Sequence, residues 1–140
     1  MNLLEPWTTP FGLAPFDRVS DDDFAPAMDM ALAQARSGMQ AIAQSSQVPS
    51  FENTIEAQEL AEEPLNQLAA AFYTLATTES TPQREALQRD FAPKLSAYAS
   101  AVTSNVALFA RIEDLWSRRA SLGLSPEQER VLMLTRRDFI

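Results

Sequence analysis

The 140-residue sequence contains neither histidine nor cysteine. Histidine is the most common general base and metal ligand, and cysteine supplies the thiolates of catalytic, zinc and disulfide sites. The chain therefore lacks the residues for a Ser-His or Cys-His nucleophile pair and for the ordinary kinds of zinc site. We expect no catalytic residue, no metal site and no cofactor within this chain. The absence of cysteine also fits a cytoplasmic location.

The sequence is poor in glycine, with three residues, and it has a single lysine, Lys94. Few glycines leave few sites for left-handed turns, which favours long helices joined by short loops. The net charge of −8 disfavours nucleic acid as a partner, because phosphate backbones would be repelled. No apolar run approaches the roughly 18 residues of a membrane span, so we expect no membrane segment.

Apolar residues recur at spacings of three and four through most of the chain, which is the period of an amphipathic helix. A length of 140 residues corresponds to about one domain. We therefore predict an all-α fold, an antiparallel bundle of about five helices, in residues 21–140. The predicted core faces are Phe24, Met28, Ala31, Leu32, Ala35, Met39 and Ile42; Ala61, Leu65, Leu68, Ala69, Phe72, Leu75 and Ala76; Leu87, Phe91, Leu95, Tyr98 and Val102; Val106, Phe109, Ile112, Leu115 and Trp116; and Val131, Leu132, Leu134 and Phe139.

Helix-start signals precede each of these faces. Ser20 is followed by three acidic residues, and Ser125 is followed by proline and then by glutamine at the third helical position. Ser50 and Asn53 can each accept a hydrogen bond from first-turn N–H groups, which predicts a second helix from about Asn53. Ile55 lies at the edge of its stripe and Gln58 interrupts it. The other predicted starts are a capping box over residues 80–83, with proline in its first turn, and a cap at residues 104–105.

Proline and glycine predict where helices bend or end. Pro64 predicts a kink or a short break in the second helix, and Pro93 predicts a bend in the third. Gly123 is a favourable stop after the fourth helix, whose last turns should contain Arg118 and Arg119.

The two ends of the chain differ from its middle. Residues 1–20 contain three helix-breaking prolines among large apolar residues, so we expect an extended strap that packs across the helices or docks on a partner. The last helical pattern runs to Ile140 without a stop signal. We therefore expect residues 21–140 to be one helical domain, truncated in its last helix.

Three groups of residues could carry chemistry, and each also has a simpler interpretation. Residues 21–23 are three aspartates, but no loop glycine or downstream glutamate completes a calcium pattern. Met28, Met30 and Met39 could form an adaptable binding surface, although core filling is the favoured interpretation. A row of glutamates at helical spacing could bind metal or act as acid and base, but we favour a solvated face. The row consists of Glu52, Glu56, Glu59 and Glu63.

The order of several short segments resembles the opening of bacterial peptidyl-dipeptidases, members of the thimet-oligopeptidase/oligopeptidase A-type zinc metallopeptidase family. The most specific segment is FENTI at residues 51–55, which resembles a T-F-E-N-T-I segment near the N-terminus of that family. The others are NLLEPW at 2–7, PFGLAPFD at 10–17, FAPAM at 24–28, FAPKL at 91–95, NVALF at 105–109 and LSPEQ at 124–128. Pro64 departs from the family pattern, in which this helix usually runs on.

The resemblance implies a nearly all-helical enzyme with two lobes around a deep channel that admits short peptides. In the family, zinc is held by an H-E-x-x-H helix and a downstream glutamate, and a zinc-bound water attacks the peptide bond. Those residues lie in the C-terminal half of family members and cannot be placed on a chain without histidine. The chain then corresponds to the N-terminal helical domain, which helps to wall the channel.

Two main functions remain open from the sequence. The first is the non-catalytic N-terminal domain of a zinc-dependent peptidase that releases dipeptides from oligopeptide C-termini, with its own catalytic domain and short peptides as partners. The alternative is a free-standing helical module for protein interaction. A carboxylate enzyme that uses the glutamate row is a weaker third possibility. We also expect the isolated chain to dimerise through apolar surface that would face a missing lobe.

Overall fold

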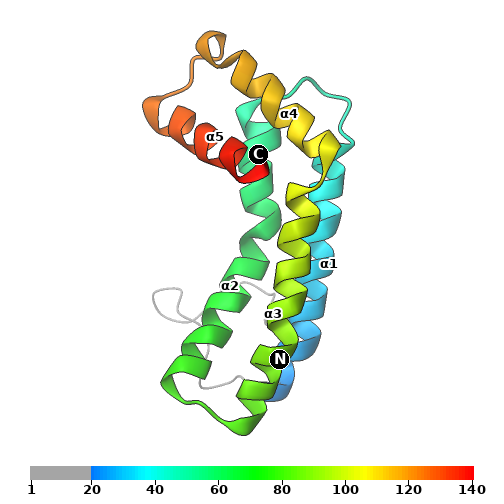
Figure 1. The fold of residues 1–140 in the computed structure, drawn as a ribbon, viewed down its shortest axis with the longest axis vertical. Coiled ribbons are helices and arrows are strands. Elements are labelled where there is room, and N and C mark those ends of the chain that lie inside the picture. The colour runs from blue at the N-terminus through cyan, green and yellow to red at the C-terminus, as the bar shows by residue number, and fades with distance from the viewer. Residues whose placement is uncertain (1–19) are drawn as a thin grey trace. The chain divides into compact units, whose positions relative to one another are not determined.

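The computed structural model describes residues 20–140, which form five α-helices and three short helical turns (Figure 1). This part of the chain contains no β-strand, so the all-α prediction is confirmed. The predicted strap lies outside the described residues, apart from Ser20. In chain order the elements are η2 (Asp21–Asp23), α1 (Phe24–Ala43), η3 (Phe51–Glu56), α2 (Ala57–Thr78), α3 (Pro82–Thr103), α4 (Val106–Ser117), η4 (Arg119–Ser121) and α5 (Pro126–Phe139).

The described residues divide into two compact units. The first unit contains residues 20–35 and 62–97, and the second contains residues 36–61 and 98–140. Each unit is therefore built from segments that are distant in the sequence, and each has buried apolar residues of its own.

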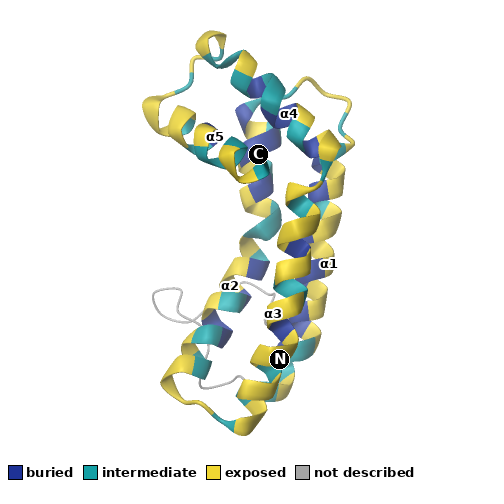
Figure 2. Ribbon diagram, in the orientation of Figure 1, coloured by how far each residue is buried: buried dark blue, intermediate teal, exposed yellow. Residues whose placement is uncertain are grey.

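The core of the first unit centres on three aromatic rings from three helices. Phe72 of α2 lies 5.2 Å from Phe24 of α1 and 4.9 Å from Phe91 of α3, both in edge-to-face geometry. Such pairs add to the stabilisation from area burial, because the edge of one ring meets the electron-rich face of the other. Within this unit, α1, α2 and α3 run in alternating directions, and buried positions recur along them (Figures 1 and 2).

An ion-pair group joins α1 and α3 in the first unit. The Lys94 ammonium lies 2.9 Å from Asp29 on α1 and 3.2 Å from Asp90, one turn earlier on α3. The hydrogen bond that Lys94 donates to Asp29, followed by the one that it donates to Asp90, raises the pKa of Lys94 above its ordinary value. The only lysine of the chain thus links two helices of this unit.

Three of the predicted helix starts are confirmed as capping boxes. Ser20, Ser50 and Ser125 each accept a hydrogen bond at the start of a helix, while the third residue of that helix accepts from the serine N–H. At the first of these boxes, the N–H of Ser20 donates to Asp23 and lowers the pKa of that carboxyl group. Each cap satisfies N–H groups that have no partner within the helix.

The third helix begins one residue away from its predicted cap. Thr81 is the residue whose hydroxyl accepts from the N–H of Arg84, and Pro82 is the first helical residue. Ser80 instead donates to the Glu85 carboxylate, so the predicted capping box over residues 80–83 is wrong. Both hydroxyl residues are good caps, and the preference of proline for the first helical position decides between them.

Pro64 does not break α2, which continues from Ala57 to Thr78 with this proline inside it. Of the predicted kink or short break, the short break is wrong and the kink stays a prediction, and the departure from the family pattern leaves the helix continuous. Pro64 removes one backbone hydrogen bond, but the next turns are held by Leu65 and Leu68, which are buried. Pro93 likewise lies within the continuous helix α3.

The face of α4 that is buried differs from the predicted one. Ile112 and Leu115 are buried as expected, but Val106 is 80% exposed and its expected place is taken by Leu108 and Arg111. Arg118 and Arg119 fall just beyond α4, as its C-cap and the first residue of η4. Gly123 follows η4 with a φ of 66°, a left-handed conformation that glycine adopts at little cost. The fourth helix itself ends earlier than predicted, at Ser117.

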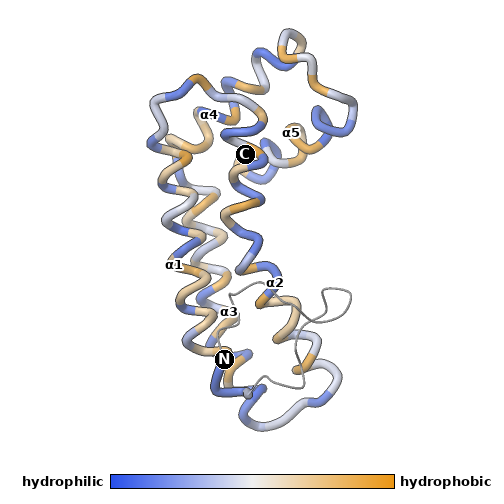
Figure 3. The backbone as a smooth tube through the Cα atoms, turned by 180° about the vertical axis from the view of Figure 1, so that it is seen from behind, coloured by the Kyte–Doolittle hydropathy of each residue, from blue (hydrophilic) through white to orange (hydrophobic). Residues whose placement is uncertain are grey.

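Hydrophobic and hydrophilic residues are interspersed along the helices (Figure 3). Within residues 20–140, no helix combines the length and the apolar character that crossing a membrane would require.

Candidate functional site

The predicted acidic groups are not assembled into a site. Glu52, Glu56, Glu59 and Glu63 are all exposed, as the solvated-face interpretation predicted. No cluster of acidic residues within residues 20–140 has the arrangement needed to hold a metal ion. Of the three methionines considered for a binding surface, Met28 and Met39 are buried and Met30 is half exposed.

The FENTI segment forms η3, a π-helical turn that leads into α2 in the second unit. Three side chains of the segment are buried, namely Phe51, Thr54 and Ile55, and so is Gln58 in the first turn of α2. Ile55 was expected at the edge of the apolar face, and Gln58 was expected to interrupt it. They are buried because α4 and α5 pack against η3, which the sequence of the second helix alone does not reveal.

Arg111 of α4 connects this turn to the loop that precedes it. Its Nη1 donates to the carbonyl oxygens of Ser45 and Gln47, at 3.1 and 2.9 Å. Its Nη2 donates to Asn53 Oδ1 at 3.1 Å and to Thr54 Oγ1 at 3.3 Å. The guanidinium group thus holds residues 45–54 against α4.

The side chain of Arg111 is only 8% exposed, although arginine is rarely buried. Its partners are neutral oxygens, and its buried Nε has no hydrogen-bond partner among the described residues. A guanidinium carries five donors in a fixed plane and is weakly hydrated, so it can serve as a buried link between several acceptors. The arrangement is a structural joint, because it presents no nucleophile or proton donor to a substrate.

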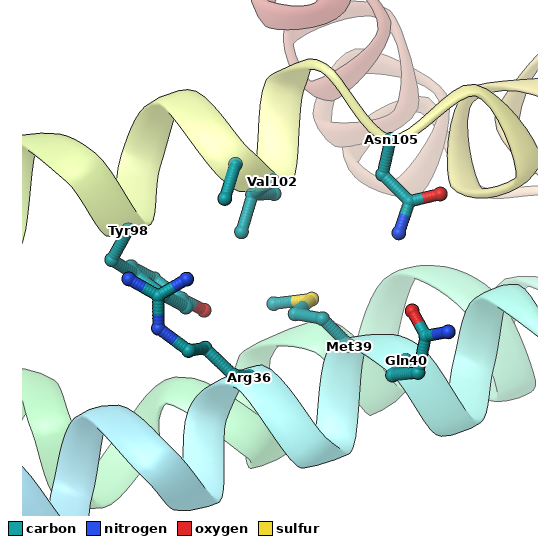
Figure 4. Close-up of a pocket in the computed structure, with 7 residues that line it drawn as sticks. Arg36, Met39, Gln40, Tyr98, Val102 and Asn105 are labelled. Carbon is teal, nitrogen blue, oxygen red and sulfur yellow. The ribbon is translucent and has the colours of Figure 1, made fainter.

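A hollow of about 280 Å³ in the second unit is a candidate binding site (Figure 4). It lies between the C-terminal parts of α1 and α3, next to the start of α4. Seven residues line it, namely Arg36, Met39, Gln40, Tyr98, Ala101, Val102 and Asn105. The volume is just below the range of small-molecule sites, so the hollow has room for one or two side chains.

The lining of this hollow, which we call the α1–α3 pocket, combines an apolar floor with polar donors. Met39 and Tyr98 are 3% and 4% exposed and form part of the floor. The Arg36 guanidinium lies 5.8 Å from the centre of the Tyr98 ring, a cation–π distance. None of the seven residues is acidic or nucleophilic in the manner of a catalytic group, so the pocket can bind but has no evident chemistry.

A second hollow, in the first unit, lies along one face of α2 and is lined by Ala70, Tyr73, Thr74, Thr77 and Thr78. The hydroxyls of Thr74 and Thr78 donate to backbone carbonyl oxygens one turn earlier in the same helix. Because these hydroxyl groups are used in hydrogen bonds within the helix, we regard this hollow as an ordinary surface depression and not as a binding site.

Sequence reasoning did not find the α1–α3 pocket or Arg111. A signal for the pocket was present in the distribution of charge. All 19 acidic residues lie outside two stretches, 30–51 and 91–112, which contain the whole lining of the pocket. No comparable signal existed for Arg111, because an arginine at a helical position is normally read as solvated.

Comparison with known proteins identifies relatives among peptidases. No protein-family model matches the chain. The chain is 32% identical over 133 residues to a dipeptidyl carboxypeptidase of Escherichia coli (strain K12), which covers 95% of the chain. It is 30% identical over 138 residues, or 99% of the chain, to a dipeptidyl carboxypeptidase of Salmonella typhimurium (strain LT2). The chain spans 20% of the length of each of these relatives.

The matched region covers nearly all of the chain, including the FENTI segment and the residues around Arg111. This chain is therefore a relative of the bacterial dipeptidyl carboxypeptidases over a stretch equal to one fifth of their length, and the resemblance seen in its sequence is confirmed.

Proposed function

We propose that this chain is the non-catalytic N-terminal helical domain of a zinc-dependent peptidyl-dipeptidase, and that it helps to wall the channel that receives peptide substrates. The observation that carries the proposal is the similarity to dipeptidyl carboxypeptidases along nearly the whole chain. This similarity covers only 20% of the length of those relatives, as a single domain would.

The donor set of the chain does not fit a zinc site. The sequence offers no imidazole and no thiolate, and zinc sites are built mainly from these groups. The glutamates of the row Glu52–Glu63 are exposed and do not converge on a common point. The zinc and the groups that activate water would then come from the remainder of the parent protein.

The chemistry of the best-formed features supports a structural and binding role. Arg111 fixes the FENTI turn and the loop before it against α4, through two hydrogen bonds to each, and the α1–α3 pocket presents donors over an apolar floor. The partners of the chain would be its own catalytic domain and, in the assembled enzyme, short peptides. A cytoplasmic location is part of the same proposal.

The proposal is tested by comparing the isolated chain with a chimaera. In the chimaera, this chain replaces the matched 133-residue segment of the E. coli dipeptidyl carboxypeptidase. After dialysis against zinc, the isolated chain should retain no stoichiometric metal and release no dipeptide from an oligopeptide. The chimaera should retain zinc and release dipeptides, whereas the enzyme with the segment deleted should lose activity.

Stoichiometric zinc or turnover in the isolated chain would contradict the non-catalytic role. A deletion variant that is folded by circular dichroism and fully active would contradict a role in the channel wall. Sedimentation of the isolated chain at increasing concentration tests the expected dimer separately, since a monomer throughout would exclude it.

The alternative is a helical module that binds a protein partner in its own right. The specific observation that favours it is the α1–α3 pocket, whose lining lacks acidic residues in an acidic chain. A protein that is folded and binds a partner without any peptidase domain would support this alternative.

A further inference from the structure

The α1–α3 pocket lies in a part of the chain with an unusual charge distribution. The two stretches that form it, 30–51 and 91–112, contain no aspartate or glutamate, while the rest of the chain carries all 19 acidic residues. The same stretches contain Arg36, Lys94 and Arg111. The net charge of −8 disfavours a carboxylate in general, whereas the lining of the pocket contains no acidic residue and one cation, Arg36.

Arg36 is the charged group of the pocket, and its side chain is exposed. Among the described residues, no carboxylate lies within ion-pairing distance of it, and its guanidinium group lies over the Tyr98 ring. The half-buried cations Lys94 and Arg118 are paired with Asp29 and Asp114. Arg36 is exposed at the pocket, so an incoming carboxylate can reach its guanidinium group.

Two carboxamides line the same pocket, at the end away from this cation (Figure 4). The Oδ1 of Asn105 accepts a hydrogen bond from the N–H of Leu108, so its amide nitrogen is the group left to face the pocket. Figure 4 shows the Asn105 and Gln40 side chains pointing toward one another across the pocket, with Met39 between Gln40 and Arg36. Guanidinium and amide N–H groups are the donors that a carboxylate accepts from.

The rest of the pocket suits an apolar side chain and the backbone that carries it. Met39 and Tyr98 supply a buried apolar floor, and methionine adapts its shape to different side chains. Ala101 also lines the pocket, and because it is small and exposed, a polypeptide backbone can come close. A single cation suits a monoanionic carboxylate better than a phosphate dianion in a chain of net charge −8.

We infer that the α1–α3 pocket is a docking site for a protein segment that places an apolar side chain on the Met39 and Tyr98 floor and a neighbouring glutamate or aspartate carboxylate on Arg36. The inference goes beyond the proposed function, because it requires neither zinc nor a peptidase domain. It assigns to this chain an interaction surface with a defined chemistry.

Nuclear magnetic resonance titration of the 15N-labelled chain tests the inference. The probe is acetyl-Ala-Leu-Glu-Leu-Ala-amide, in which the glutamate side chain carries the only charge. It should produce saturable shifts in the side-chain N–H signals of Arg36, Gln40 and Asn105. The neutral twin with glutamine in place of glutamate should bind roughly fivefold or more weakly, since it loses the charge-assisted hydrogen bonds.

Two variants and their matched controls locate the effect. Arg36→Gln should weaken binding of the glutamate peptide roughly fivefold or more, whereas Arg130→Gln, an exposed arginine of α5, should leave it unchanged. Ala101→Glu should abolish binding because it supplies a competing carboxylate at the pocket. Ala107→Glu adds the same charge to an exposed position that does not line the pocket and should have little effect. All four positions are exposed, so the variants should fold.

Three outcomes would overturn the inference. They are the absence of shifts at the pocket, equal binding of the glutamate and glutamine peptides, and unchanged binding by Arg36→Gln. A third probe, the glutamine peptide with a free C-terminal carboxylate, distinguishes a chain end from a side chain. If that peptide binds and the glutamate peptide does not, the pocket recognises chain ends and the inference is wrong. None of these results bears on zinc content or dipeptide release, so the proposed function is tested separately.

Discussion

Asn53 Oδ1 accepts a hydrogen bond from Arg111 Nη2 at 3.1 Å, although the two residues are 58 positions apart. The same oxygen accepts from the N–H of Ser50 and from the hydroxyl of Thr54, both at 2.8 Å. The asparagine amide nitrogen donates to the carbonyl oxygen of Val48. One side chain therefore caps η3, fixes the loop before it and anchors the buried arginine. These hydrogen bonds explain structurally why the FENTI segment has asparagine and threonine at these two positions.

Asn53→Ala should lower the free energy of unfolding by about 2 kcal/mol, because it removes part of a capping box and an acceptor of Arg111. Urea unfolding followed by circular dichroism measures the change. Asn66→Ala, at an exposed position of α2, is the matched control and should stay within about 0.5 kcal/mol of the original protein. Equal stability of the two variants would show that the Asn53 hydrogen bonds contribute little.

Arg111→Met should destabilise the protein by about 2–4 kcal/mol, since it leaves several oxygen acceptors without their donor. Hydrogen exchange should become faster at the amides of residues 51–58 before it does so in α1, because the joint between α4 and η3 is lost. Arg130→Met removes an exposed arginine and should change neither quantity. Unchanged protection of residues 51–58 in Arg111→Met would contradict the role given to Arg111.

Gly38→Ala should destabilise the second unit, although alanine is the better helix former by about 1 kcal/mol. A Cβ atom at this position of α1 would lie 2.6 Å from the Cβ of Ala61 on α2, far inside van der Waals contact. We expect a net loss of about 1–3 kcal/mol in urea unfolding. The double variant Gly38→Ala with Ala61→Gly removes the clash and should recover most of the loss. Failure of this rescue would show that the contact does not determine the stability of the single variant.

Lys94 should titrate above its ordinary pKa of 10.5 in the folded protein, because Asp29 and Asp90 stabilise its charged form. The raised pKa means that the Lys94 contribution to stability is fully present below the pKa of the unfolded chain. It is lost as the pH rises through the folded pKa. Since Lys94 is the only lysine, 13C-lysine labelling gives one ε-methylene signal whose midpoint reports this pKa directly.

The matched variants for this titration are Asp29→Asn and Asp90→Asn. Both should lower the midpoint toward 10.5, and the change should be larger for Asp29→Asn, whose hydrogen bond is the main cause of the shift. A midpoint that is insensitive to Asp29→Asn would mean that the ion pair seen between α1 and α3 is not formed in solution.

The helices of this protein were predictable because their signals are local. The stripe from Phe24 to Ile42 is buried at every predicted position, since the first helix has a strict helical period and few competing residues. The caps at Ser20, Ser50 and Ser125 were predictable for the same reason, because a capping box involves only residues three apart. The start at Thr81 was misplaced because two adjacent hydroxyl residues satisfy the same rule, and only the position of Pro82 separates them.

The amino-acid sequence by itself determined the helical class, the sites of the caps, the absence of imidazole and thiol chemistry, and the resemblance to peptidyl-dipeptidases. Tertiary structure alone decided that α4 turns Leu108 and Arg111 inward and leaves Val106 exposed. It also decided that residues 36–43 and 98–105 enclose a pocket without acidic groups. Periodicity states which residues of one helix share a face, whereas the partner of that face depends on contacts between segments roughly 60 residues apart, which no local pattern encodes.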